Sequence, residues 1–149
     1  MKNNFKQFIL CAAALLSVNA VFAGQDMPSG CPAAMSIAAA GVSVAKTMNN
    51  EVWALIEPAN TYQTNRVWSF VVEQIKGKSA QEVLAKVNKQ LGYMVLTDSV
   101  RMEGNDGPAY YCLYEHETDA DIVGIAGTPE IDIDSAVISR LTAKIRKKI

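Results

Sequence analysis

The sequence has little net charge and a single histidine. Its 149 residues carry 14 Lys and Arg against 15 Asp and Glu, a formal net charge of −1. General nucleic-acid binders usually have a basic excess, so this balance argues against nucleic acid as a partner. Half of the residues are hydrophobic and 19% are charged, a composition that excludes a disordered chain. The length suits one domain and leaves little room for two.

Common catalytic and phosphate-binding motifs are also missing. The chain has no G-x-S-x-G turn to present a serine, no G-x-x-x-x-G-K-[ST] loop and no G-x-G-x-x-G loop. A nucleophilic side chain usually needs a histidine as its base. His116 lies in a predicted strand between Glu115 and Glu117, with no nucleophile beside it. We therefore expect no catalytic residue of this kind and no cofactor.

Long hydrophobic runs are absent except near the start, where residues 1–23 have the pattern of a secretory signal peptide. Lys2 and Lys6 precede an apolar run at 8–16, and a small residue, Ala23, marks the expected cleavage site. The run is shorter than the roughly 20 apolar residues of a transmembrane helix, although an uncleaved membrane anchor is the alternative. We expect an exported chain, periplasmic or secreted, with no transmembrane segment. Without residues 1–23 it has 12 basic and 15 acidic residues, a net charge of −3.

Cysteines are few, and Cys11 leaves with the signal peptide. Cys31 and Cys112 remain, and an even number in an exported chain predicts a disulfide between them. A structural zinc site would need four ligands, and only His116 could join the two thiols. A redox pair usually has the C-x-x-C spacing, which these two lack.

The apolar pattern predicts an α+β domain. We expect an antiparallel β-sheet of about five or six strands packed against a central helix, with a C-terminal helix after the sheet. Residues 24–31 read as a flexible arm and 32–149 as a single domain. The expected helices are 32–40, 79–91 and 132–149, the last with a basic end; the expected strands are 51–57, 66–75, 93–102, 109–116 and 121–126.

Particular residues set the expected ends of these elements. Ser79 and Glu82 form a capping-box pattern at the start of the central helix, and Gly92 is expected to stop it in the left-handed conformation. Pro58 is expected to end the first clear strand. In the last helix Asp134 is the expected cap, and the apolar residues that share one face are Val137, Ile138, Leu141 and Ile145.

Acidic residues are concentrated between residues 102 and 139, where nine Asp and Glu occur with no Lys or Arg. Glu117, Asp119 and Asp121 recur at every second position, a spacing that can supply oxygen ligands to Ca²⁺. The EF-hand pattern fails, because Ile122 stands where glycine is needed and Thr128 where glutamate is needed. The alternative is a solvated strand edge whose charges prevent aggregation.

The same acids suggest a second function. A hydrolase that uses paired carboxylates could combine Glu115 or Glu117 with Asp119 or Asp121, although this chemistry needs two acids across a cleft. Aromatic side chains suggest a binding surface instead, because Tyr and Trp suit interfaces that are apolar on one side and exposed to water on the other. The candidate binding residues are Trp53, Tyr62, Trp68, Tyr111 and Tyr114.

Several short patterns resemble a family of small exported bacterial proteins classed as a domain of unknown function. They are Cys31-Pro32, Gly41-Val42-Ser43, Trp53 and the run 62–70, Tyr-Gln-Thr-Asn-Arg-Val-Trp-Ser-Phe. The resemblance covers about 31–127, leaves the basic C-terminal helix outside, and implies export and a single small domain without any activity or site residue.

We take as the leading hypothesis an exported, non-enzymatic domain that binds a protein or small ligand through a sheet surface. The carboxylate hydrolase and a Ca²⁺-dependent binding module are the alternatives. The identity of the ligand, the strand order and the oligomeric state stay open at this point.

Overall fold

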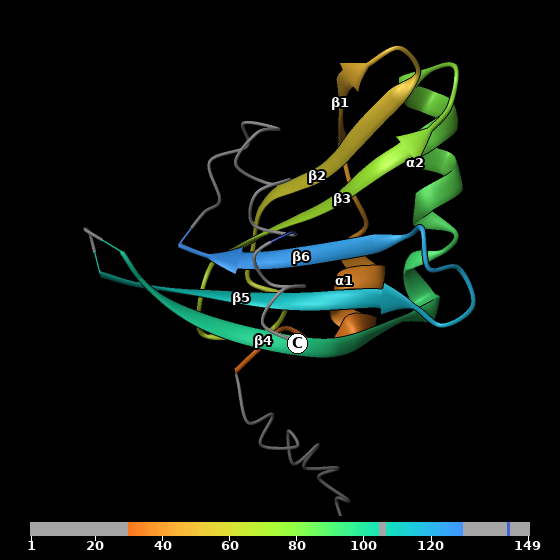
Figure 1. Ribbon diagram of the computed structural model, residues 1–149. Helices are drawn as coiled ribbons and strands as arrows, with labels where there is room; N and C mark the ends of the chain where they lie inside the picture. The colour runs from red at the N-terminus through yellow and green to blue at the C-terminus, as the bar shows by residue number, and fades with distance from the viewer. Residues whose placement is uncertain (1–29, 105–106, 130–142, 144–149) are drawn as a thin grey trace, which may run out of the picture.

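The computed structural model describes residues 30–104 and 107–129, together with Ala143 (Figure 1). The expected signal peptide at 1–23 and nearly all of the arm at 24–31 lie outside these residues. So does the expected C-terminal helix at 132–149, apart from Ala143. The described residues define one sheet, its core and the surroundings of Cys31 and Cys112.

Six strands form one sheet in the order β1-β2-β3-β6-β5-β4, and every neighbouring pair is antiparallel. The predicted antiparallel sheet with accompanying helices is therefore confirmed. In chain order the elements are α1 (Ala34–Ala40), β1 (Val44–Asn49), β2 (Val52–Asn60), β3 (Trp68–Lys76), α2 (Ala80–Asn88), the 3₁₀ turn η1 (Leu91–Tyr93), β4 (Met94–Gly104), β5 (Gly107–His116) and β6 (Val123–Thr128).

The sheet joins two meanders of three strands each. β1, β2 and β3 are consecutive, α2 then leads to β4 at the far edge, and β5 and β6 return toward the centre (Figure 1). β6 pairs with β3 on one side and with β5 on the other, so that Ile125 lies opposite both Val71 and Leu113. The last described strand is therefore the one that makes the two halves of the chain a single sheet.

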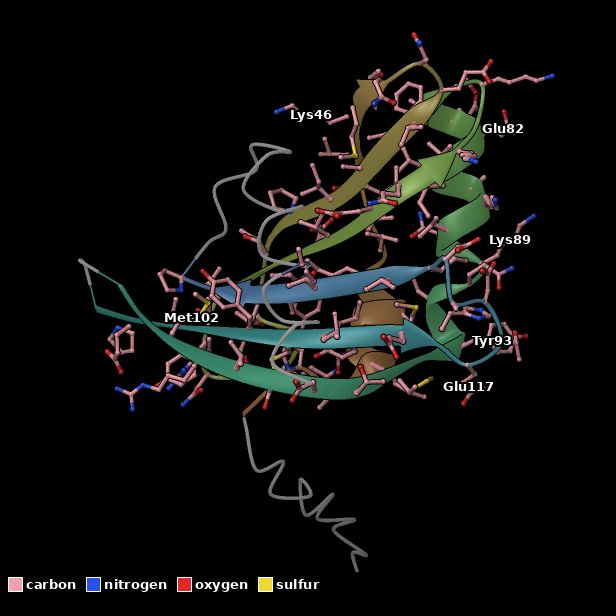
Figure 2. All side chains as sticks on the ribbon, in the orientation of Figure 1. Lys46, Glu82, Lys89, Tyr93, Met102 and Glu117 are labelled. Atoms are coloured by element: carbon pink, nitrogen blue, oxygen red, sulfur yellow. A yellow bond between two sulfur atoms is a disulfide. The ribbon has the colours of Figure 1, made fainter. Side chains whose placement is uncertain are left out.

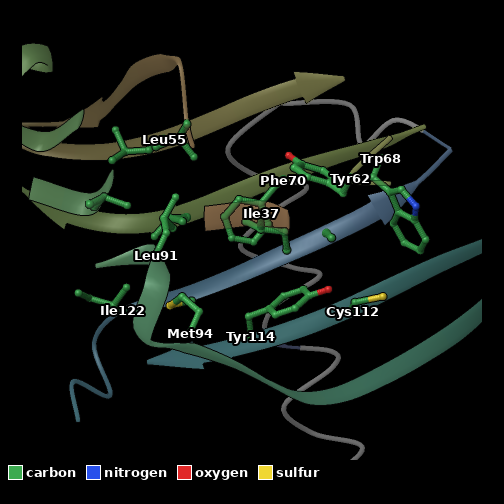
Figure 3. Packing of buried hydrophobic residues seen from close by; sticks show 14 of the residues in the cluster. Ile37, Leu55, Tyr62, Trp68, Phe70, Leu91, Met94, Cys112, Tyr114 and Ile122 are labelled. Atoms are coloured by element: carbon green, nitrogen blue, oxygen red, sulfur yellow. The ribbon is translucent and has the colours of Figure 1, made fainter. Parts of the chain in front are cut away.

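One face of the sheet carries the larger core, together with α1 and α2. Side chains alternate between the two faces of a strand, so Phe70 and Val72 point to this face while Val71 points to the other. The largest buried residues are Trp68, Phe70 and Tyr114, each with 0% of its surface exposed (Figure 3). The helices add Ile37, Val83, Val87 and, from η1, Leu91.

Close packing in this core needs a glycine at position 124. The rings of Phe70 and Tyr114 meet edge to face, with centroids 5.9 Å apart. A Cβ atom at Gly124 would lie only 2.5 Å from Cζ of Phe70, a distance at which atoms overlap. The glycine thus lets the Phe70 ring lie directly over the backbone of β6.

The opposite face carries a second, smaller apolar cluster. Its buried members are Ala54, Ile56, Val71, Leu113, Val123 and Ile125. All six belong to strands β2, β3, β5 and β6, and none belongs to a described helix. This face explains why these strands are apolar on both sides, as the sequence predicts for the central strand at 66–75.

Strand β2 runs through Pro58, where the sequence predicts that it ends. Proline has no N–H to donate, so it is tolerated only where no neighbouring strand needs that group. β1 pairs with β2 no further than Ile56, and Pro58 therefore lies beyond the end of β1. Its carbonyl accepts the Ser69 hydroxyl of β3 at 2.7 Å. The predicted end is wrong because the local signal does not show how far the neighbouring strand extends.

Helix α2 begins as predicted and ends early. Ser79 accepts a hydrogen bond from the Glu82 N–H at 3.2 Å, which confirms the N-cap. The helix ends at Asn88, and the tighter turn η1 then carries the fully buried Leu91 into the core. Gly92 lies inside η1 and does not have a positive φ. The predicted extension to Leu91 with a left-handed stop at Gly92 is therefore wrong.

The predicted disulfide is confirmed. Cys31 and Cys112 are bonded, with Cα atoms 5.8 Å apart and a sequence separation of 81. Both cysteines are buried in the core that faces α1, so the bond ties the segment before α1 to strand β5. A disulfide of this kind is typical of exported proteins. Within the described residues, no helix has the length and apolar character needed to cross a membrane.

Candidate functional site: an arginine–tyrosine pocket beside the disulfide

The five candidate aromatic residues lie in different environments. Tyr62, Trp68 and Tyr114 are buried, and they contribute to the core rather than to an exposed surface. Trp53 is half-buried and donates its indole N–H to the carbonyl of Gly77 at 2.8 Å. Tyr111 is half-buried beside the smaller cluster. Aromatic composition alone could not separate core positions from surface positions.

A tight turn between β2 and β3 holds Tyr62 in the core. Tyr62 and Gln63 both have positive φ angles, 46° and 64°, and the Thr64 N–H donates to the Thr61 carbonyl at 2.8 Å. Positive φ is costly for residues other than glycine, so surrounding contacts must hold the turn in place. The Asn60 side chain supplies one, because it accepts the Tyr62 N–H at 2.9 Å.

Thr64 is the centre of the hydrogen bonds in this turn. Its hydroxyl lies 2.7 Å from the Thr61 carbonyl and accepts the indole N–H of Trp68 at 3.0 Å. The same oxygen accepts the Arg66 N–H at 3.2 Å. The buried Trp68 and the Thr61 carbonyl thus fix the Thr64 hydroxyl, which in turn holds the backbone from which the Arg66 side chain extends.

Arg66 lies over the ring of Tyr110 on strand β5. The carbon atom of its guanidinium is 4.4 Å from the ring centroid, and that of Arg101 on β4 is 5.8 Å from the same centroid. Both distances fall within the range of cation–π attraction. Arg101 and Tyr110 are directly paired across the two strands, which places them on the same face as Cys112.

A pocket of about 210 Å³ adjoins these side chains at the end of the sheet that carries Met102 (Figure 2). Its lining combines the disulfide with residues of β4 and β5: Cys31, Ser99, Val100, Arg101, Tyr110, Tyr111 and Cys112. Of the candidate aromatic residues, only Tyr111 lines it. The lining of the pocket therefore includes the disulfide, two tyrosines and one arginine, Arg101.

The two arginines near this pocket differ in their acidic partners. Arg101 forms an ion pair with Glu103, with nitrogen and oxygen 2.9 Å apart, and both side chains are largely exposed. Exposed pairs of this kind contribute about 0–1 kcal/mol and exchange readily. Arg66 has no acidic partner within ion-pair distance among residues 30–104 and 107–129. Arg66, which is outside the pocket lining, thus keeps a positive charge over the ring of Tyr110, which is part of that lining.

Two buried tyrosines of the larger core, Tyr62 in the turn and Tyr114 on β5, differ in their hydrogen bonds. Burial raises the pKa of Tyr62 well above its ordinary value, and the negative charge of Glu57 raises it further. Burial also raises the pKa of Tyr114, with a smaller contribution from Tyr62. The Tyr114 hydroxyl donates to the Pro32 carbonyl at 2.6 Å, whereas the Tyr62 hydroxyl has no partner within the described residues.

The predicted metal and hydrolase residues lie at the other end of the sheet. Asp119 and Asp121 line a second pocket of about 320 Å³, which Lys76 and Lys86 also line, while Glu117 is outside that lining. Glu117 lies beside η1, where its N–H donates to the Tyr93 carbonyl at 3.0 Å (Figure 2). Among the residues that the structure describes, no three His, Cys, Asp or Glu side chains are grouped closely enough to hold a metal ion.

His116 organises the loop between β5 and β6. Its Nδ1 accepts the backbone N–H groups of Thr118 and Asp119 at 3.2 and 3.0 Å. The accepting Nδ1 places the ring proton on Nε2, which lies 3.0 Å from the side-chain oxygen of Gln90. Both nitrogens thus have hydrogen-bond partners within the fold, and the Thr118 hydroxyl also lies 3.4 Å from Nδ1.

A comparison with protein families identifies the relationship. The family described as Domain of unknown function (DUF4949) matches residues 30–141. The chain belongs to this family. The match confirms the resemblance seen in the sequence and extends it from residue 127 to 141, so that part of the expected C-terminal helix lies inside the DUF4949 domain.

The family description brings no activity or site residue to the DUF4949 domain. No curated protein and no solved structure shows significant similarity to the chain. The candidate site is therefore supported by its geometry and not by a similar protein. Sequence reasoning missed the grouping of Arg66, Arg101 and Tyr110, because the turn and the β4–β5 register bring them together. The sequence shows only that Arg66 belongs to the run at 62–70 and that alternation places Tyr110 on the face of Cys112.

Proposed function

We propose that this protein is an exported, non-enzymatic binding domain whose pocket beside the disulfide takes the carboxylate group of a ligand. The observation that carries the proposal is Arg66, held over the Tyr110 ring by an ordered turn and lacking an acidic partner within the described residues. A guanidinium that lies over a ring keeps its N–H groups at the edge free to bind a carboxylate.

The volume of the pocket favours a small chemical group, rather than a whole large molecule, as its occupant. A volume of about 210 Å³ is smaller than most drug-sized sites, which occupy roughly 300–1,000 Å³. The ligand is therefore a small carboxylate, or an acidic or carboxylate-bearing part of a larger partner. An aromatic or apolar portion of the ligand would contact Tyr110 and the disulfide.

Ligand binding is tested with benzoate and its neutral analogue benzamide. We expect benzoate to shift the amide NMR signals of Arg101, Tyr110 and Cys112 with a dissociation constant of the order of 1 mM, about −4 kcal/mol. Benzamide should bind at least fivefold more weakly, because the arginines recognise the charge. Equal binding of the two compounds would contradict the proposal.

Matched variants separate the pocket from general electrostatics. Arg66→Gln should weaken benzoate binding at least fivefold, and Arg66→Lys should recover only part of it because lysine lacks the planar fork. Lys89→Gln removes the same charge from an exposed position at the end of α2 and should leave binding unchanged. If Arg66→Gln binds benzoate as tightly as Lys89→Gln does, the site is not this pocket.

Export is tested independently of binding. The supporting features are the pattern of residues 1–23 and a disulfide of the kind found in oxidising compartments. Mass spectrometry of the protein from the periplasm or medium should give a chain that begins near Gly24. An intact N-terminus in the cytosol, with free thiols at Cys31 and Cys112, would contradict export.

A further inference from the structure

The second face of the sheet is buried although no described helix packs on it. Val71 and Leu113 have 0% of their surface exposed and Ile125 has 1%, while the helices α1 and α2 contribute to the opposite face. In Figure 1 the viewer looks onto this second face, and α1 lies behind the strands. Its cover must come from a part of the chain, or from a partner, that is not among these elements.

Neighbouring strands cannot bury these side chains by themselves. Side chains stand perpendicular to a sheet, so strands at a spacing of about 4.8 Å shield their sides and leave their ends open to water. An antiparallel sheet with one bare face therefore shows polar residues there. Ile56, Val71 and Leu113 are apolar and buried instead, which is the pattern of a covered face.

We infer that residues 130–149 cover this face as an amphipathic helix. The segment follows directly from β6, which ends at Thr128 in the interior of the sheet, between β3 and β5. The chain before Cys31 starts instead from the other face, because Cys31 is bonded to Cys112 in the core beneath α1. Position in the fold thus favours the C-terminal segment over the N-terminal one.

The sequence of residues 130–149 fits an amphipathic helix that packs on this face. Val137, Ile138, Leu141 and Ile145 share one helical face, and Asp134 can cap the helix. Twelve residues from 134 to 145 would span about 18 Å as a helix. The four strands of the cluster, β2 to β5 across the sheet, span three strand spacings or about 14 Å. The apolar stripe is therefore long enough to cross the whole cluster.

Methyl NMR tests the contact directly in the full chain. We expect nuclear Overhauser effects between the methyl groups of Ile138 or Leu141 and those of Leu113 or Ile125. Labelled and unlabelled chains are then mixed, and isotope filtering removes the effects that arise between different chains. The expected effects should remain unchanged, because both methyl groups of each pair belong to one chain. If the effects arise only between two chains, a second copy covers the face, and if none is seen the segment does not dock; either result overturns the inference.

Two charge-matched variants add a test that does not depend on assignments. Leu141→Glu lies on the apolar stripe and should increase the fluorescence of a hydrophobic dye several-fold by freeing the sheet face. Ser139→Glu lies on the opposite side of the same helix and should leave it unchanged. Equal dye binding by the two variants would overturn the assigned helix face even if both proteins stay folded.

Discussion

Removal of one hydroxyl from either of two buried tyrosines should change stability in opposite directions. The Tyr62 hydroxyl is buried and has no hydrogen-bond partner within the described residues, whereas the Tyr114 hydroxyl donates to the Pro32 carbonyl at 2.6 Å. Tyr62→Phe and Tyr114→Phe delete the same atom from the same core. The pair therefore separates the effect of the hydrogen bond from that of the ring.

The expected magnitudes follow from the cost of burying polar groups. An unpaired buried hydroxyl costs about 1–3 kcal/mol, so Tyr62→Phe should raise the free energy of unfolding by about 1 kcal/mol. Tyr114→Phe loses a buried hydrogen bond and leaves the Pro32 carbonyl unpaired, so it should lower that free energy by about 1–3 kcal/mol. The difference between the variants should be at least about 2 kcal/mol.

Urea unfolding followed by tryptophan fluorescence measures both variants, because Trp68 is fully buried in the same cluster. The disulfide must stay oxidised throughout. The midpoints should move in opposite directions while the slope stays constant, which identifies a change of stability. If Tyr62→Phe is destabilised as much as Tyr114→Phe, the Tyr62 hydroxyl is hydrogen-bonded in the native protein and the reasoning is refuted.

Alkaline pH gives a second measurement on the same side chains. Burial raises the pKa of both tyrosines above the ordinary value of about 10, so the unfolded chain releases these protons first. The free energy of unfolding should be unaffected below about pH 9 and fall above pH 10, by about 1.4 kcal/mol per pH unit for each tyrosine that stays protonated. Each Phe variant should show a shallower fall; an unchanged slope would contradict burial of the hydroxyl.

Three further predictions concern other contacts. Replacement of Cys31 and Cys112 by serine should lower the free energy of unfolding by about 2–5 kcal/mol in urea titrations, and an unchanged midpoint would show that the bond is not formed. Gly124→Ala should lower the free energy of unfolding by about 1–3 kcal/mol in the same assay because the new methyl overlaps Phe70, and an unchanged midpoint would contradict this overlap. His116→Ala should speed hydrogen exchange at the Thr118 and Asp119 amides, with amides elsewhere in the sheet as the internal control.

Much of the local structure could be predicted because its causes are local. Ser79 caps α2 through its own side chain, and the alternation in β5 places Tyr110, Cys112 and Tyr114 on one face. The disulfide was predictable from the number of cysteines left once residues 1–23 are taken as a signal peptide. The cap and the strand face depend on spacing along the chain and the disulfide on a count of cysteines, and the sequence displays both directly.

The predictions failed where residues far away in the sequence determine the local structure. Pro58 stays within β2 because β1 is short, and Leu91 leaves helix α2 because the core lies to one side. Tyr62 is a predicted binding residue, yet a turn with positive φ angles buries it in the core. None of these outcomes follows from the propensity of the residue itself.

The sequence by itself determined the compartment expectation, the cysteine pair, the type of most elements and the family, since each is encoded by composition or by residues close together. The tertiary structure decided that β6 enters between β3 and β5, because only strand pairing brings residues from both halves together. It also decided the candidate site. Arg66 and Arg101 are 35 positions apart, and only the ordered turn and the β4–β5 register bring both guanidinium groups to the ring of Tyr110.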